Sequence, residues 1–200
     1  MKSTKFLTAV AIATVVASSA WAQQTQRVKG TVEKVDGHTL TIKGPGGAPI
    51  TLNLTDKALV VGVMKATLAD IKEGSYIGSG ALPQPDGTQK AVEVHIFAES
   101  QRGTGDGHRA NWDGAPNGTM TNGAVGNTVS SVDGQAIMIK YKDGEKKIIV
   151  GPNVPIVRYE IGDKSEIKPG AAINVVAAKK MPDGTFEAAR INVGRNGLVP

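Results

Sequence analysis

The residues whose types could bind a metal ion or a ring lie together in a glycine-rich stretch, residues 99–121. Asp106, His108 and Asp113 offer two carboxylates and one imidazole there, a ligand set suited to a hard or borderline metal ion. Trp112 lies beside them and could stack on a sugar or a base. A single histidine without a second histidine or a cysteine nearby is a weak zinc signature. The alternative interpretation is a flexible tether whose Trp112 packs between two folded units.

A second group of candidate residues is basic and lies in the second half of the chain. Lys140 and Lys142 flank Tyr141 in a predicted strand, while Lys179 and Lys180 precede a turn. In an OB-type barrel these places correspond to strands 2–3 and to the loop between strands 4 and 5, where such folds bind oligonucleotides or oligosaccharides. Strand alternation turns Tyr141 away from the two lysines beside it, and few aromatic residues accompany them, whereas single-strand binding uses several. The alternative is a solvated face that keeps strand edges from pairing with other chains.

No catalytic motif accompanies these candidates. The sequence lacks the G-x-S-x-G and H-E-x-x-H motifs and a phosphate-binding glycine loop, so we expect no enzymatic activity and no cofactor. It also lacks cysteine, which excludes disulfides and thiolate chemistry. His38, after a turn, is interpreted as an exposed residue, and His95, in a predicted strand, as a residue of a sheet face.

The first 22 residues have the pattern of an export signal. An apolar run of about a dozen residues, Phe6–Ala17, follows two lysines and is too short for a comfortable membrane span. Ala20-Trp21-Ala22 then supplies small residues for cleavage between Ala22 and Gln23. We therefore expect a periplasmic or secreted mature chain that is not an integral membrane protein; the alternative is a retained membrane anchor. The net charge of +5 falls to +3 when the two lysines leave, less than the dense basic surface typical of nucleic-acid-binding proteins.

The elements that must position these residues are short strands, and their pattern occurs twice. Val28–Lys43 alternates apolar and polar residues on both sides of Asp36-Gly37, as in two strands joined by a two-residue turn. The same pattern returns 97 residues later around Asp133-Gly134. Two further motifs recur in the same order: Ile71-Lys72-Glu73-Gly74 as Ile167-Lys168-Pro169-Gly170, and Pro85-Asp86-Gly87-Thr88 as Pro182-Asp183-Gly184-Thr185.

Each copy is predicted to contain three strands, a short helical turn and two more strands, the order of a small OB-type barrel. Thr67 is the predicted cap of the helical turn in the first copy. We therefore predict an all-β protein of two tandem OB-fold-like five-stranded barrels joined by a glycine-rich linker. The predicted boundaries are 1–22 for the signal peptide, 23–98 for the first module, 99–121 for the linker and 122–200 for the second module.

These motifs resemble a group of exported bacterial proteins built from a repeated OB-like domain of unknown function. The resemblance rests on the Val-Asp-Gly turn, the Ile-Lys-x-Gly step and the Pro-Asp-Gly-Thr turn, and Gly105–Asn122 is similar to the linker of two-copy members. It implies the OB-like fold and export, and it supplies no catalytic or binding residues. Some relatives carry a label as the permease of a metal transporter. Such a permease needs several membrane spans, and no second apolar segment of that length occurs in this sequence.

The predicted function is non-catalytic binding of an unknown small ligand, an envelope polysaccharide or an envelope protein. The candidate contacts are Trp112, Lys140, Tyr141, Lys142, Lys179 and Lys180. One alternative is a structural or stress-related envelope protein that acts through protein–protein contacts. Another is a weak binder of anions or nucleic acid that uses the basic second module.

Overall fold

The computed structural model describes residues 25–131 and 134–200 and is all-β, with three short 3-10 turns as its other regular structure. The predicted signal peptide lies outside the described residues, as do Val132 and Asp133 of the second predicted hairpin turn. Among the described residues, no helix has the length and apolar character needed to cross a membrane. The strands are β1 Thr25–Asp36, β2 Thr39–Lys43, β3 Pro49–Ala66, β4 Tyr76–Pro83, β5 Gln89–Ile96, β6 Gly107–Trp112, β7 Gly118–Ser131, β8 Gly134–Tyr141, β9 Gly144–Val150, β10 Ile156–Ile161, β11 Ala172–Lys180 and β12 Phe186–Gly194.

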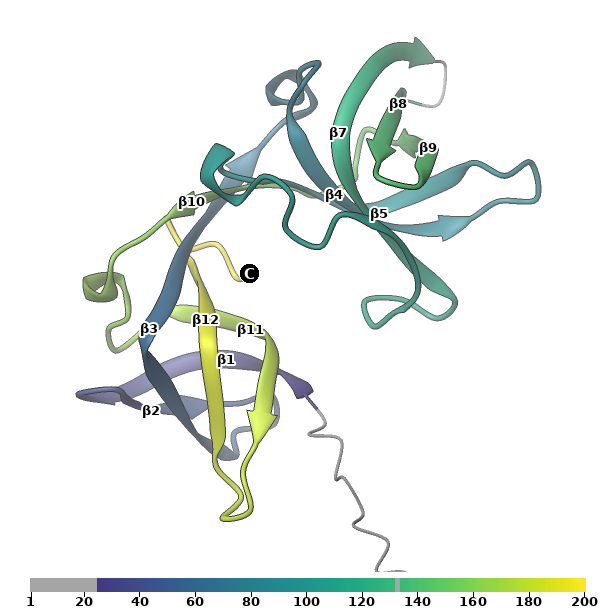
Figure 1. Ribbon diagram of the computed structural model, residues 1–200. Coiled ribbons are helices and arrows are strands. Elements are labelled where there is room, and N and C mark those ends of the chain that lie inside the picture. Colours follow the sequence, from purple (N-terminus) through teal and green to yellow (C-terminus); the bar gives the residue numbers. More distant parts are fainter. Residues whose placement is uncertain (1–24, 132–133) are drawn as a thin grey trace, which may run out of the picture.

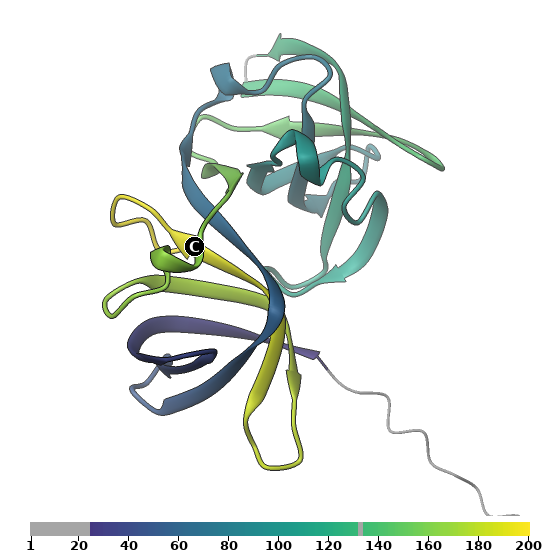
Figure 2. The same ribbon diagram turned by 60° about the vertical axis from the view of Figure 1, so that its left-hand side comes forward.

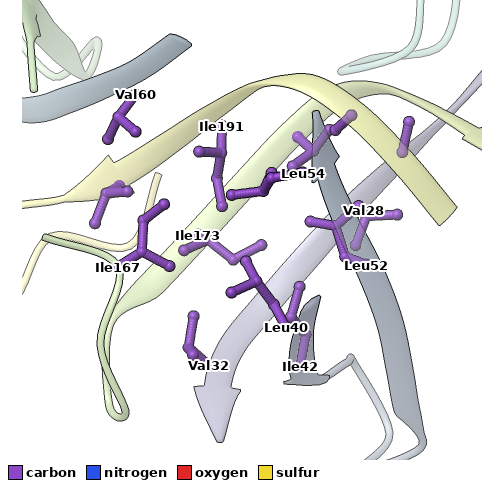
Figure 3. Packing of buried hydrophobic residues seen from close by; sticks show 14 residues of the cluster. Val28, Val32, Leu40, Ile42, Leu52, Leu54, Val60, Ile167, Ile173 and Ile191 are labelled. Carbon is purple, nitrogen blue, oxygen red and sulfur yellow. The ribbon is translucent and has the colours of Figure 1, made fainter. Parts of the chain in front are cut away.

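The first barrel is a closed circuit of five strands in the order β1-β2-β3-β12-β11. All neighbours are antiparallel except β3 and β12, which are parallel. Alternate residues of each strand point inward, so Leu40 and Ile42 of β2 are buried while Thr39 and Lys43 are exposed. The inward side chains form one aliphatic core that includes Leu52 and Ile191 (Figure 3).

A second closed circuit has the order β7-β8-β9-β5-β4, again with one parallel pair, between β9 and β5. Its core contains Ile77 and Val94 from the first sequence copy and Ile137, Ile139 and Ile148 from the second. Both circuits therefore have the strand order of the predicted five-stranded barrel.

The two sequence copies exchange their last two strands. β1–β3 of the first copy close with β11 and β12 of the second, and β7–β9 of the second copy close with β4 and β5 of the first. In Figure 1 the lower barrel accordingly combines purple and blue strands with yellow ones. The tandem modules with boundaries 23–98 and 122–200 are thus not confirmed, since each barrel contains strands from both ranges.

The physical basis of the exchange is the length of β3. This strand has 18 residues and continues out of the first barrel to pair antiparallel with β10. β10 also pairs in parallel with β5 of the second barrel. The chain that leaves the first barrel along β3 therefore continues into β4 of the second barrel, and the chain that leaves the second barrel along β10 continues into β11 of the first. Figure 2 shows β3 running between the two barrels.

Part of the predicted linker, residues 99–121, forms a strand against the second barrel. β6 pairs antiparallel with β7, and β7 begins at Gly118 and pairs with β4. Asn111 and Asn117 have positive φ angles of 59° and 56°, a backbone region that asparagine tolerates better than most residues. These two asparagines lie at the tight connection between β6 and β7.

The predicted turns occur in both copies with the same hydrogen bonds. The Asp86 Oδ1 atom accepts from the Thr88 backbone N–H at 3.0 Å, and Asp183 Oδ1 accepts from Thr185 at 3.0 Å. The predicted helical turn after Thr67 is confirmed as a 3-10 turn over Leu68–Asp70.

Candidate functional site

A cleft of about 940 Å³ lies between the two barrels. One wall is formed by β5 and β7 of the second barrel and by β6 beside it, and the other by β12, β11 and β1 of the first. β3 and β10 join the barrels along one side of this space, and Val63 and Tyr159 from these two strands line the cleft. Because both barrels have the same strand order, matching strands face each other across the cleft.

Two glycines of β4 lie beneath the side chains of the first wall. Gly78 is paired with His95 of β5 and with Asn122 of β7, while Gly80 is paired with Glu93 in the next row of the same face. A Cβ atom at Gly78 would overlap the His95 ring and lie 2.6 Å from Asn122 Oδ1. Only glycine leaves room for these two polar side chains to converge over β4.

Trp112 covers the neighbouring glycine. A Cβ atom at Gly80 would lie 2.5 Å from the indole ring, and Gly114 and Gly118 are also in contact with it. The indole therefore lies on a surface of three glycines and lines the cleft. Trp112 thus lies between the two barrels, as the alternative interpretation of the sequence placed it. The sequence did not indicate that Gly80, Gly114 and Gly118 would contact its indole ring.

His95 is a buried, neutral imidazole at the back of the cleft. It is 7% exposed, and burial lowers its pKa to about 3. Its ring stacks on Tyr159 with 5.0 Å between centroids and meets Phe97 edge-on at 4.9 Å. The prediction that His95 lies on a sheet face agrees with its place on β5. A neutral imidazole offers one donor and one acceptor nitrogen.

Asn122 presents an unsatisfied acceptor beside His95. Its Nδ2 atom donates to the Thr104 carbonyl at 3.1 Å, which fixes the amide. Its Oδ1 atom is buried and has no hydrogen-bond partner among the described residues. Because a buried polar atom without a partner is costly, this oxygen marks a place where a donor is expected.

Glu93 adds a negative charge to the same wall. Burial raises the pKa of its carboxyl group, and the nearby Arg27 and Lys29 oppose that effect. Within the described chain, no cationic nitrogen lies close enough to Glu93 to form a salt bridge.

The second wall presents an uncompensated cation, Arg190 of β12. Its Nε atom donates to Asn192 Oδ1 at 3.3 Å, and its terminal nitrogens lie 3.2 and 3.3 Å from the side-chain amide oxygen of Gln101, in the orientation that satisfies that amide. The guanidinium also lies over the Tyr159 ring, 5.6 Å from its centroid. Burial lowers the pKa of Arg190, and the described residues provide no carboxylate partner for it.

An ion pair connects the two walls. Arg27 of β1 donates from Nε and a terminal nitrogen to both carboxylate oxygens of Asp113, at 2.8 and 2.6 Å. Such a two-point geometry fixes both partners in orientation as well as distance. Arg27 is therefore neutralised within the cleft, whereas Arg190 is not.

Comparison with protein-family models, with curated proteins and with solved structures found no match to the chain. The site is therefore interpreted from its own geometry.

The residues predicted as metal ligands have separate partners. Asp106 accepts from the Tyr76 hydroxyl at 3.2 Å and from the backbone N–H of Lys142 at 2.8 Å. The Nδ1 atom of His108 lies 2.8 Å from the Thr121 hydroxyl, and Asp113 pairs with Arg27. The part of the chain that the structure describes contains no group of three such residues able to hold a metal ion.

The predicted basic contacts are divided between the two barrels. Lys140, Tyr141 and Lys142 belong to β8 or the turn after it, whereas Lys179 and Lys180 end β11 of the other barrel. The strand exchange separates them. In the barrel that contains β8, the fourth and fifth strands are β4 and β5 of the first copy, so the loop between those strands does not contain Lys179 and Lys180. Tyr141 lies instead over His108, with 6.5 Å between ring centroids. Of the six predicted contacts, Trp112 alone is among the residues that line the cleft.

Most of the cleft residues were not identified from the sequence. They include Arg27, Glu93, Asn122 and Tyr159. One available signal was the repeat itself, because Glu93 and Arg190 are 97 residues apart and so occupy matching positions with opposite charges.

Proposed function

We propose that this protein binds, without catalysis, a small molecule that carries an anionic group and occupies the cleft between the two barrels. The observation that carries the proposal is Arg190. Its guanidinium is partly buried and bonded to neutral amides, and no carboxylate among the described residues balances its charge. A buried, unpaired charge is costly, so an anionic ligand is the expected partner.

The dimensions of the cleft support a small molecule rather than a polymer. Small-molecule sites generally have volumes of roughly 300 to 1,000 Å³ and combine apolar walls with a few placed polar groups. Here the volume is about 940 Å³, and the rings of Phe97, Trp112 and Tyr159 accompany the polar groups.

The state of His95 supports binding without catalysis. A general acid or base works best when its pKa lies near the working pH. Burial holds the pKa of His95 at about 3, so its imidazole remains neutral and serves as a hydrogen-bonding group. We further propose that binding takes place in the periplasm or outside the cell, on the basis of the N-terminal sequence pattern.

The test is a thermal-unfolding screen of the protein against small carboxylates and phosphates, each with an uncharged analogue. A ligand bound only by the folded state raises the melting temperature by mass action. The proposal predicts a rise with at least one anion and its loss in Arg190→Gln.

Two control variants make the result specific. Arg158→Gln removes an arginine outside the cleft, and Lys140→Gln combined with Lys142→Gln removes the predicted basic strand. Both control variants should retain the ligand-induced rise in melting temperature. A shift that survives Arg190→Gln but disappears in the lysine variant would contradict the cleft site and favour an anion site on β8.

A further inference from the structure

The two walls of the cleft have opposite electrostatic character at matching positions. Glu93 on β5 corresponds to Arg190 on β12, at the 97-residue spacing of the repeat. Tyr159 lies under the Arg190 guanidinium; burial raises the pKa of its hydroxyl to about 12, the Glu93 carboxylate adds to that rise, and Arg190 opposes it. Glu93 and Arg190 do not form an ion pair with each other.

The first wall offers acceptors. The Asn122 Oδ1 atom is buried without a partner, and the Glu93 carboxylate is partly buried without an ion pair within the described chain. A ligand group that donates several hydrogen bonds and carries a positive charge suits each of these acceptors. An ammonium group does so, since it has three donors and no acceptor.

The second wall offers donors. Arg190 presents its guanidinium, and Lys29 of β1 lines the same side of the cleft. A guanidinium matches the planar, two-oxygen geometry of a carboxylate. The cleft of about 940 Å³, lined by the rings of Phe97, Trp112 and Tyr159, has room for an uncharged body between the two charged ends.

We propose that the ligand is a small zwitterion, with its carboxylate on Arg190 and its ammonium group on the wall of Glu93 and Asn122. This inference rests on the proposed function and narrows its ligand class. Free amino acids and the two termini of short peptides share this chemistry. Both fit the stated contacts, and they differ in the length of the body between the charges.

The experiment is a calorimetric and thermal-shift titration of the protein with the twenty free amino acids and a set of dipeptides. The best binder is then compared with its deaminated acid and its decarboxylated amine. We expect each analogue to bind at least about tenfold more weakly, the usual effect of losing a hydrogen-bonded charge contact. Whether an amino acid or a dipeptide binds more tightly distinguishes the two sources.

Variants assign the two ends. Glu93→Gln should weaken the zwitterion and leave the deaminated acid unchanged, and Arg190→Gln should weaken the zwitterion and leave the decarboxylated amine unchanged. Glu145→Gln, an exposed position of β9, is the matched control. If the deaminated acid binds as tightly as the zwitterion and still depends on Arg190, the zwitterion inference is overturned and the proposed function stands. If neither zwitterions nor simple anions bind through Arg190, both proposals fail.

Discussion

Val63 of β3 and Tyr159 of β10 are directly paired across an antiparallel ladder, and they are 96 residues apart. The spacing of the sequence repeat is 96 to 97 residues, so this pair joins one position of the repeat to its own counterpart. Such a pairing marks a local two-fold axis between the copies. The exchange of strands and the facing walls of the cleft both follow from an arrangement about this axis.

Cutting the chain between Gly103 and Thr104 should leave two fragments that remain associated. The site is exposed, and each barrel core contains residues from both sides of the cut. Introducing a protease site there and measuring the mass of the cleaved protein in native buffer tests this prediction. Two separate folded monomers would show that each copy closes on itself.

Gly123→Ala should lower the free energy of unfolding by about 2 to 3 kcal/mol or more, because overpacking against fixed groups is costly. The added Cβ would overlap the Lys140 carbonyl oxygen and lie 2.9 Å from an Ile139 methyl group. Gly126→Ala, in the same strand, meets only the flexible side chain of Lys140, with the nearest atom at 2.9 Å. Urea unfolding should place the second variant within about 1 kcal/mol of the wild type. Equal effects would contradict the close approach at Gly123.

His95 should make the protein less stable as the pH falls. Its pKa is about 3 in the folded state and about 6.5 in an unfolded chain, so the unfolded state binds more protons between these values. The free energy of unfolding should therefore fall by about 2 kcal/mol from pH 6.5 to pH 5. Urea unfolding at these two pH values measures the change.

His95→Asn, which copies Asn192 at the matching position, should remove most of this pH dependence. A smaller dependence of the same sign should remain from His108, since burial lowers its pKa as well. The raised pKa of Glu93 acts in the opposite direction, because protonation favours the folded state there. An unchanged slope in the variant would mean that His95 is not buried in the neutral form.

Gly78→Ala should abolish ligand binding and destabilise the fold by about 1 to 3 kcal/mol. The new Cβ would displace the His95 ring and the Asn122 amide from the hollow. Gly126→Ala, which lies outside the cleft and meets only the Lys140 side chain, serves as the control. Binding that persists in Gly78→Ala would place the ligand elsewhere.

The strands, turns and barrel order could be predicted because they depend on local patterns. Leu40 and Ile42 alternate with polar residues, and Asp86 and Asp183 begin turns whose hydrogen bonds reach only two residues ahead. The exchange could not be predicted in this way. The exchange depends on whether β3 turns back into its own barrel after Val60 or continues toward the other barrel. Both paths give the same alternation of apolar and polar residues, so the sequence pattern does not distinguish them.

The cleft was missed for the same reason. Glu93 and Arg190 are unremarkable in their own strands, and they face a common space only because β5 and β12 belong to different barrels. Lys142 and Lys180, which formed one predicted surface, are separated by the same exchange. Trp112 was identified because a tryptophan is conspicuous in a glycine-rich stretch, although the glycines that support it became evident only in three dimensions.

The most direct test of the cleft as the binding site is a ¹⁵N NMR titration with the tightest binder from the screens. We predict that the largest shifts occur at the Trp112 indole N–H, the Asn122 side-chain amide and the Arg190 Nε–H, and that the backbone of Lys140–Lys142 remains unchanged. Shifts confined to Lys140–Lys142 or to the Lys179–Lys180 end of β11, with none in the cleft, would contradict the account.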